Sequence, residues 1–346
     1  MLTTTATLLA LLAPAEAPGQ LPQHATIQRE TWVMGTSLVI TAQSAEPEIA
    51  LRAISAAFDT VRYFDHLLST WRQDTELAQL NHAPVGSNAK LSPALAALLD
   101  EASRFKEITR GTFDPAIGPL VDAYDLRGVG RTPDPASLRT ALAASGLEQF
   151  ELDAANARAK RLHPSAWIDS GGFGKGAALR AAAHALRSRG ISQASLNFGG
   201  QVLVLGNPPE LNLVAVAHPA KRDRAVAALR LADASVATSG QSERPGHILD
   251  PRTGQKVVPW GSVSVAARDP LAADILATAL FVMGPEEACR WAASQHEIAV
   301  LLLIETGATI EARWNRPMND LLLYLDSHDV SQTSNASPRR VSCDAQ

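Results

Sequence analysis

Short apolar runs separated by turn residues dominate the second half of the chain, and they constrain the fold more than any other feature of the sequence. The runs have the length of β-strands, and no helical segment alternates regularly with them. They cover residues 195–198, 202–205, 211–217, 235–238 and 262–267. Because parallel sheets are built from regular strand–helix–strand units, this order predicts a mixed α+β fold with helices packed on sheets.

Helical patterns occupy much of the remaining chain and begin or end at typical capping residues. A long helix is expected after Glu46, a second after the cap residue Ser92, and a third from about Lys175 to Gly190. The other expected elements are a strand pair over 27–42 turning at 34–36, a short helix over 137–144, a hairpin over 150–162, a strand over 167–169, a helix between 269–270 and 284–285, and a strand over 298–304. Helices and strands therefore both contribute to the core.

Length and charge narrow the class of protein. The chain has 346 residues, of which 46% are hydrophobic and 19% charged, and its formal net charge is -4. The length predicts one two-lobed unit or two closely packed lobes, and the composition is typical of a globular protein. Binding along a nucleic-acid backbone requires clustered Lys and Arg, which this acidic chain lacks, so nucleic acid is not an expected partner.

The two ends of the chain and the cysteines carry weaker signals. No apolar stretch is long enough to cross a bilayer, so no transmembrane helix is expected. Residues 1–20 resemble an export leader without the usual leading Lys or Arg, which favours a periplasmic or exported protein, with a cytoplasmic location as the alternative. Cys289 and Cys343 indicate neither a zinc site nor a disulfide framework. The tail over 327–346 is polar, and we expect it to fray.

Four glycines lie within six positions, at 171, 172, 174 and 176, where the helix expected from about Lys175 begins. Exposed N–H groups at a helix N-terminus favour anions, so the cluster suggests a phosphate close to the backbone. It is not a P-loop, because Asp169 and Gly176 stand where that motif needs a glycine and a hydroxyl. It fits the dinucleotide fingerprint loosely, since no acidic residue follows about 20 positions on. A tight turn that needs glycine is the alternative interpretation.

A candidate metal site lies in the helix that follows Asp269. Asp274 and Thr278 are separated by four positions, so their oxygens project from one face of this helix. Such a pair suits a hard cation such as Mg²⁺, which takes few protein oxygens. The other interpretation is a polar stripe on an apolar helix. Because most neighbours of Asp274 are apolar, its carboxylate should lie near the core and needs a partner there.

His247 lies in a loop with several polar neighbours, followed by the turn sequence Asp-Pro-Arg-Thr-Gly. Imidazole exchanges protons near neutral pH, so His247 is a candidate for proton transfer. An orienting role or simple exposure to solvent is equally consistent with the sequence.

Taken together, these segments resemble the ApbE family of FAD:protein FMN transferases. The resemblance covers about 34–284, and it depends on the order of several motifs rather than on any single one. The motifs are Met34-Gly35-Thr36, Ser69-Thr70-Trp71, Gly111-Thr112-Phe113-Asp114-Pro115, Asp169 to Gly176, Asn197 to Gly200, Thr238-Ser239-Gly240, His247 to Gly254 and Ala273 to Leu280. Two positions depart from the family pattern. Gly174 stands where the family usually has Ala, and Gln201 follows the pair Gly199-Gly200 where the family usually has Asp.

The resemblance implies a two-lobed fold over 27–326, with mainly antiparallel sheets flanked by helices and an FAD cleft between the lobes. It implies that the protein cleaves FAD with the help of Mg²⁺, attaches FMN to a Ser or Thr of an acceptor protein, and releases AMP. The acceptor is typically a subunit of a membrane redox complex, and family members are commonly exported. An FAD pyrophosphatase that yields FMN and AMP, or a non-catalytic FAD-binding protein, remains an alternative.

The resemblance also assigns site residues. The Asp274 carboxylate, the Thr278 hydroxyl and the Gly174 carbonyl would bind the metal, and His247 or Asp274 would take the proton of the acceptor hydroxyl. The residues that would line the FAD site are Met34 and Trp71 near the flavin, Asp169, Gly171, Gly172 and Lys175 around the phosphates, and Phe113, Asp114, Thr238, Ser239 and His247 along the remaining cleft.

Overall fold

A computed structural model describes residues 25–242, 245–307, 309–326 and 341–343 of the chain. The expected leader over 1–20 lies outside the described residues, as does most of the tail. In the described part of the chain, no helix is long and apolar enough to span a membrane.

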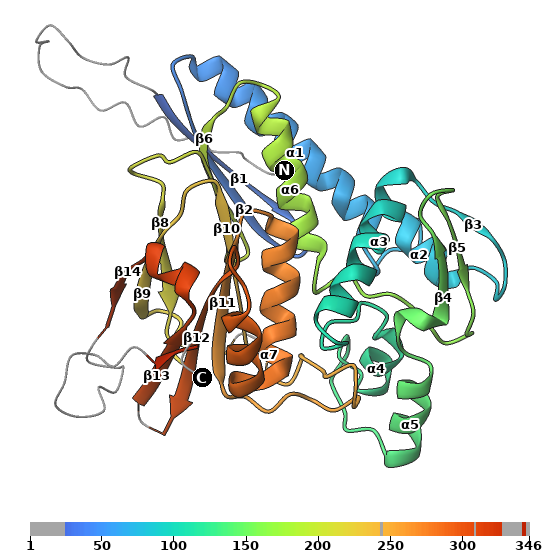
Figure 1. Ribbon diagram of the computed structural model, residues 1–346. Coiled ribbons are helices and arrows are strands. Elements are labelled where there is room, and N and C mark those ends of the chain that lie inside the picture. The colour runs from blue at the N-terminus through green and yellow to red at the C-terminus, as the bar shows by residue number, and fades with distance from the viewer. Residues whose placement is uncertain (1–24, 243–244, 308, 327–340, 344–346) are drawn as a thin grey trace, which may run out of the picture.

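A nine-stranded sheet forms the centre of the molecule (Figure 1). Its strands pair antiparallel throughout, except that the last two are parallel. In spatial order they are β1 (Ala25–Val33), β2 (Thr36–Ser44), β6 (Gln193–Phe198), β7 (Gln201–Leu205), β10 (Ala234–Gly240), β11 (Gly261–Ala267), β12 (Ala299–Thr306), β13 (Thr309–Trp314) and β15 (Val341–Ser342).

Three long helices pack against this sheet: α1 (Pro47–Leu68), α6 (Gly174–Arg187) and α7 (Pro270–Ala293). Helix α1 buries Ala50, Ile54, Ala57 and Val61, whose helical spacing places them on one face. Helix α7 follows the N-cap Asp269 and is almost entirely buried along its first half. Its regular path is interrupted at Gly284, where the backbone takes φ 76° and ψ 169°, at the point where the sequence predicts its end.

A second lobe, made mainly of helices, lies beside the sheet lobe. It holds α2 (Glu76–His82), α3 (Pro93–Ile108), α4 (Gly118–Ala123), α5 (Pro135–Ala143), η1 (Leu147–Gln149) and a small sheet of β3 (Ala89–Lys90), β5 (Arg158–Arg161) and β4 (Phe150–Asp153). The core of this lobe includes Leu271, Ile275 and Ala279 of α7, so the two lobes share that helix.

A third sheet packs beside the central one and contains β14 (Leu322–Leu325), β9 (Ala225–Arg230) and β8 (Leu213–Ala217), with η2 (Arg316–Asp320) nearby. The mixed α+β fold with mainly antiparallel sheets and two lobes is therefore confirmed. The sequence patterns did not predict β9, β13 or β14.

The strand predicted over 167–169 is wrong, because this segment joins no sheet. The backbone groups of Ile168 bond instead to the Asn81 side chain, whose Oδ1 accepts from the Ile168 amide at 2.8 Å and whose Nδ2 donates to its carbonyl at 2.9 Å. The Asp169 amide donates to the Pro115 carbonyl at 2.8 Å. Bonds to the Asn81 side chain and to the Pro115 backbone thus replace a strand ladder in holding the segment before the glycine cluster.

The cysteines form a disulfide, which corrects the expectation that they indicate none. Cys289 of α7 is bonded to Cys343, and their Cα atoms are 5.0 Å apart although 54 residues separate them in sequence. The Cys343 amide also donates to the Trp314 carbonyl at 3.1 Å, just beyond the short pairing of β15 with β13. The expected fraying of the tail does not hold at 341–343, because the fold brings these residues against α7.

Candidate functional site

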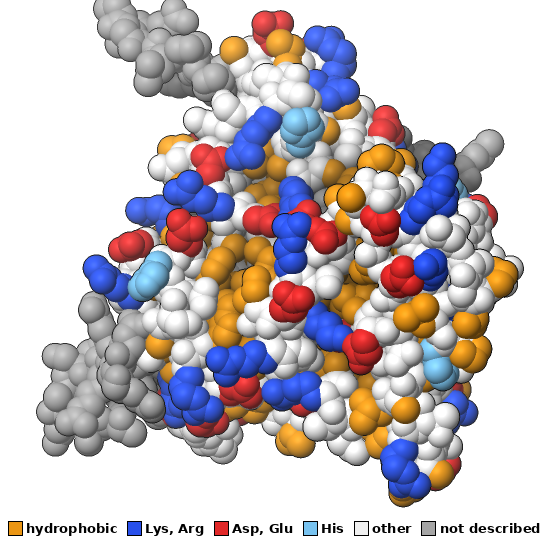
Figure 2. Space-filling view, turned by 45° about the vertical axis from the view of Figure 1, so that its right-hand side comes forward, with side chains coloured by type: hydrophobic (Ala, Val, Ile, Leu, Met, Phe, Trp, Pro, Cys, Tyr) orange, Lys and Arg blue, Asp and Glu red, His pale blue; other side chains and the backbone are white. Residues whose placement is uncertain are grey.

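A large cavity lies between the lobes, with a volume of about 1320 Å³. Figure 2 shows a hollowed face with hydrophobic side chains inside and charged side chains of both signs around it. Pockets for drug-sized ligands typically measure about 300–1,000 Å³, so this cavity has room for a dinucleotide. Every site residue assigned from the sequence lines it except Gly174.

The glycine cluster forms the turn into α6 and approaches α7 closely. The Gly176 amide donates to Asp274 Oδ2 at 2.8 Å, and a Cβ on Gly176 would lie only 2.5 Å from the Pro270 carbonyl oxygen. A Cβ on Gly172 would lie 3.9 Å from Thr278 Oγ1 and 3.3 Å from the Phe113 ring. The close approach of the two helices therefore requires glycine at position 176.

Asp274 is only 6% exposed and has the partners that a buried carboxylate needs. Besides the Gly176 amide, the Lys175 ammonium lies 3.8 Å from Asp274 Oδ1, and Thr278 follows one helical turn later. A carboxylate and a hydroxyl are hard oxygen donors that fit Mg²⁺. The described residues contain no group of three or more His, Cys, Asp or Glu side chains that would form a conventional protein metal cage.

The mouth of the cavity carries an arginine that the sequence patterns did not single out. The Arg127 guanidinium lies 4.8 Å from the Trp71 ring centroid and 4.3 Å from that of Trp167, and it donates to Asp169 Oδ2 at 2.8 Å. It also donates to the Thr70 carbonyl at 2.9 Å. Trp71 is 70% exposed, so its aromatic ring lies at the entrance of the cavity. The guanidinium of Arg127 packs against this ring.

Asp114 lines the cavity, but both of its oxygens have internal partners. Oδ1 accepts from the Ala116 amide at 2.9 Å, Oδ2 accepts from the Leu147 amide at 3.1 Å, and the Lys106 ammonium lies 2.7 Å from Oδ2. The carboxylate is therefore well placed to hold the loop that presents Phe113. Met34 reaches the cavity from the β1–β2 turn, where it adopts a left-handed φ of 50°.

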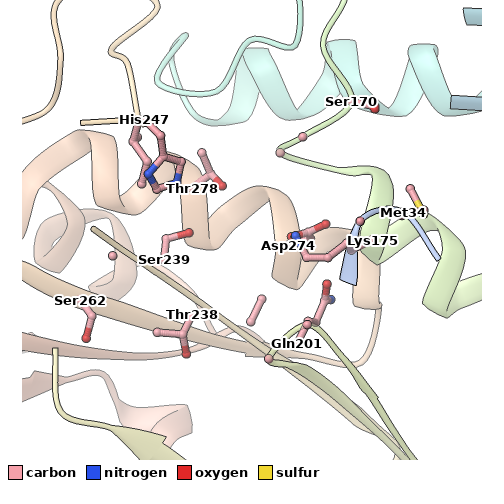
Figure 3. A pocket seen from close by; sticks show the side chains of 18 of the residues that line it. Met34, Ser170, Lys175, Gln201, Thr238, Ser239, His247, Ser262, Asp274 and Thr278 are labelled. Carbon is pink, nitrogen blue, oxygen red and sulfur yellow. The ribbon is translucent and has the colours of Figure 1, made fainter. Parts of the chain in front are cut away.

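The opposite wall is formed by β10 and the loop that carries His247. Thr238 Oγ1 lies within hydrogen-bond distance, 2.7 Å, of Ser264 Oγ on the neighbouring strand. The next residue, Ser239, is half-buried. The Gln241 side chain holds the loop by donating to the Val257 carbonyl at 2.6 Å and accepting from the Gly246 amide at 2.8 Å. In Figure 3, His247 projects toward the same side of α7 as Thr278.

Gln201 brings an unsatisfied oxygen into this cavity. Its Nε2 donates to the Pro270 carbonyl at 2.8 Å, and since a carbonyl only accepts, the amide cannot be flipped. The side chain is 3% exposed, and its Oε1 has no hydrogen-bond partner among the described residues. Figure 3 shows Gln201 pointing toward Lys175 and Asp274. The Ser262 hydroxyl on β11 is the other unsatisfied buried side-chain atom of the described residues, and it lines the same cavity.

A further carboxylate, Asp65 at the end of α1, also lines the cavity and was not predicted. Burial raises the pKa of Asp65 above its ordinary value, although the nearby Arg72 and His66 lower it. Sequence spacing alone does not reveal this residue, because α1 reaches the site only through the packing of the lobes.

An α+β fold with a deep cavity between two lobes, a buried acid, an adjacent hydroxyl and a glycine turn defines a nucleotide-handling protein. The flavin transferase ApbE from Vibrio cholerae has the same fold, with a TM-score of 0.76 and 25% identity over 86% of this chain and 100% of that one. The ApbE family model matches residues 34–302, and the chain belongs to the ApbE family.

Relatives in this family are named FAD:protein FMN transferases. One from Klebsiella pneumoniae is 29% identical over 297 residues, which are 81% of this chain and 83% of the relative. One from Rhodobacter capsulatus is 31% identical over 294 residues, which are 80% of this chain and 55% of that longer protein. The resemblance to the ApbE family seen in the sequence motifs is thereby confirmed.

Proposed function

We propose that the protein transfers FMN from FAD to a Ser or Thr hydroxyl of an acceptor protein. The hydroxyl oxygen bonds to the phosphorus of the FMN half, the bridging P–O bond of the diphosphate breaks, AMP leaves with the bridging oxygen, and the hydroxyl proton passes to a base. The observation that carries this proposal is the juxtaposition of Asp274, Thr278 and the glycine turn in one cavity of dinucleotide size. The names of the family relatives support it.

The residues of the cavity divide this work between them. Asp274, Thr278 and the Gly174 carbonyl would hold Mg²⁺, which when bound neutralises negative charge on the diphosphate. Lys175 and the backbone of the glycine turn supply further positive charge at the phosphates. Met34 and Trp71 border the flavin, and Phe113, Thr238 and Ser239 position the rest of FAD by contact along the walls.

We assign His247 as the base that accepts the proton of the acceptor hydroxyl. Asp274 already accepts from the Gly176 amide and faces Lys175, which leaves it less available as a base. His247 lies on the same side of α7 as Thr278 (Figure 3), and histidine is a common general base near neutral pH. Replacement of His247 by Gln should then slow transfer more than it weakens FAD binding.

One incubation separates transfer from the two alternatives. The protein is mixed with FAD, Mg²⁺ and a candidate acceptor, and all products are weighed by mass spectrometry. An acceptor that gains FMN less water supports transfer, whereas free FMN with AMP indicates a pyrophosphatase and unchanged FAD indicates a binding protein. The acceptor to be used is a redox subunit encoded beside this chain. With that acceptor, free FMN with AMP, or unchanged FAD, would contradict the proposal.

We further propose that the protein is exported to the periplasm, where its acceptor would be a subunit of a membrane redox complex. The Cys289–Cys343 disulfide supports this location, because disulfides persist in oxidising compartments and are rare in the cytosol. Fractionation of the native host tests it, and recovery of the chain only in the cytoplasm would contradict it.

A further inference from the structure

Strand β8 has one free edge. It pairs antiparallel with β9, and within the described residues no strand pairs with its other side. Edge strands present unpaired N–H and C=O groups that invite another strand, and proteins usually protect them. The free edge of β8 is therefore one at which a further strand can pair.

The register shows which backbone groups face outward. The Leu231 amide donates to the Asn212 carbonyl at 2.8 Å, so these two residues form a hydrogen-bonded pair across the strands. Such pairs alternate along antiparallel strands, which turns the groups of Val214 toward β9 and those of Leu213 and Ala215 toward the free edge. Outside the β8–β9 ladder, no backbone hydrogen bond from the described part of the chain reaches Leu213 or Ala215.

This edge lies inside the cavity described above. All residues of β8 line it, including Val214 and Val216, whose side chains are buried, and Leu213, which is 58% exposed. Successive side chains of a strand point to opposite faces of its sheet, so one cavity can touch all of them only along the edge. The same cavity contains Asp274, Thr278 and Lys175.

We propose that β8 receives an extended segment of the acceptor protein as an added strand, and that this pairing carries the Ser or Thr hydroxyl into the cavity. The inference rests on the proposed transferase function and names where its protein substrate docks. An extended polypeptide matches the edge because it repeats donor and acceptor groups every two residues, about 6.8 Å apart, as the edge does. FAD carries no such repeat.

The length of the edge suits a short peptide segment. Strand β8 has 5 residues, which corresponds to roughly 17 Å at about 3.4 Å per residue. Backbone pairing provides affinity that does not depend on the side chains of the peptide. The exposed Leu213 offers an apolar contact to a side chain of the segment. The acceptor would therefore be recognised mainly by an extended conformation around its hydroxyl residue.

Replacement of Ala215 by Pro tests this docking mode. Proline removes the outward N–H of Ala215, and strands tolerate proline where its missing N–H would face away from the ladder. Ala215→Val is the matched control, because it adds similar bulk and keeps the N–H. Leu213→Pro is the second variant, at the first residue of the strand, in case the melting temperature shows that Ala215→Pro fails to fold.

The probe is a pool of synthetic twelve-residue peptides, each with one central Thr and randomised flanks, incubated with FAD and Mg²⁺. Mass spectrometry measures FMN attached to the peptides, and flavin fluorescence measures FAD binding. We expect the wild-type protein and Ala215→Val to label the same peptides. A folded proline variant should label them at least about tenfold less, the loss of one to two hydrogen bonds, with the Kd for FAD unchanged within about twofold.

Three results would overturn the inference in distinguishable ways. Equal labelling by a folded proline variant would show that the edge does not bind the acceptor. Loss of FAD binding in the proline variant but not in Ala215→Val would show that the edge holds FAD instead. An absence of label with the wild-type protein, while FAD still binds, would reject peptide transfer itself and with it this docking mode.

Discussion

Gly176 and Asp274 connect the N-terminal turns of α6 and α7 through one hydrogen bond and one close packing contact. The Gly176 amide donates to Asp274 Oδ2 at 2.8 Å, and a Cβ at position 176 would lie 2.8 Å from Asp274 Cβ. The position of the carboxylate thus depends on the absence of a side chain from its neighbour. A glycine in the first turn of α6 and an acid 98 positions later in the chain thus form one structural unit.

Replacement of Gly176 by Ala tests this dependence. The new methyl group would meet the Pro270 carbonyl oxygen at 2.5 Å and backbone of Leu271 at 2.8 Å, so the helices must separate. We expect a loss of about 1–3 kcal/mol in the free energy of unfolding, measured by urea denaturation, and a fall in turnover. Gly128→Ala is the control, because the three atoms nearest to its methyl group belong to the Asp125 side chain and not to the backbone. Wild-type stability and turnover in Gly176→Ala would contradict the close approach.

Replacement of Asp274 by Asn tests the assigned metal site. Asparagine keeps the shape and can still accept from the Gly176 amide, but it removes the one charge with which this helix would hold Mg²⁺. We expect Mg²⁺-dependent turnover of FAD to fall at least about hundredfold, since a catalytic metal supplies several kcal/mol of charge stabilisation. The melting temperature should remain close to that of the wild type.

The control for this variant is Asp100→Asn, which removes an exposed partner of Arg104 on α3. Exposed ion pairs contribute about 0–1 kcal/mol, so both stability and turnover should hardly change. An Asp274→Asn protein that retains the Mg²⁺ dependence of the wild type would remove Asp274 from the metal site.

The unsatisfied Oε1 of Gln201 leads to a third prediction. Replacement of Gln201 by Asp would place a second negative charge in the cavity near Asp274, although it gives up the hydrogen bond to the Pro270 carbonyl. We expect the apparent Kd for Mg²⁺ to fall about tenfold, which corresponds to about 1.4 kcal/mol of added attraction. Calorimetric titration with Mg²⁺ in the presence of FAD measures it. Gln201→Asn is the neutral control, and an equal change in both variants would rule out the charge as the cause.

Local sequence patterns predicted the part of the site that depends on spacing along one element. The separation of Asp274 and Thr278 places them on one helix face, and the glycine turn precedes α6 as expected. Met34, Trp71 and His247 were assigned by motif order, and they line the same cavity because the family fold brings their loops together.

Contacts between distant segments could not be predicted in this way. Arg127 reaches Asp169 across 42 positions, and Asn81 reaches Ile168 across 87. No periodic pattern or local turn rule links such pairs, since each depends on how distant segments meet in the folded chain. The strand wrongly expected over 167–169 has the same origin, because an apolar run does not show whether a sheet or a side chain will satisfy its backbone.

The Cys289–Cys343 disulfide leads to the last prediction, because it secures the end of the chain against α7. A bond that closes a loop of this length typically stabilises a protein by about 2–4 kcal/mol, largely by restricting the unfolded chain. We expect Cys343→Ser to lose that amount in urea denaturation while FAD binding persists, since neither cysteine lines the cavity. Reductant should destabilise the wild-type protein by a similar amount and leave Cys343→Ser unaffected. A wild-type protein that responds to reductant no more than the variant would show that the bond does not form in solution.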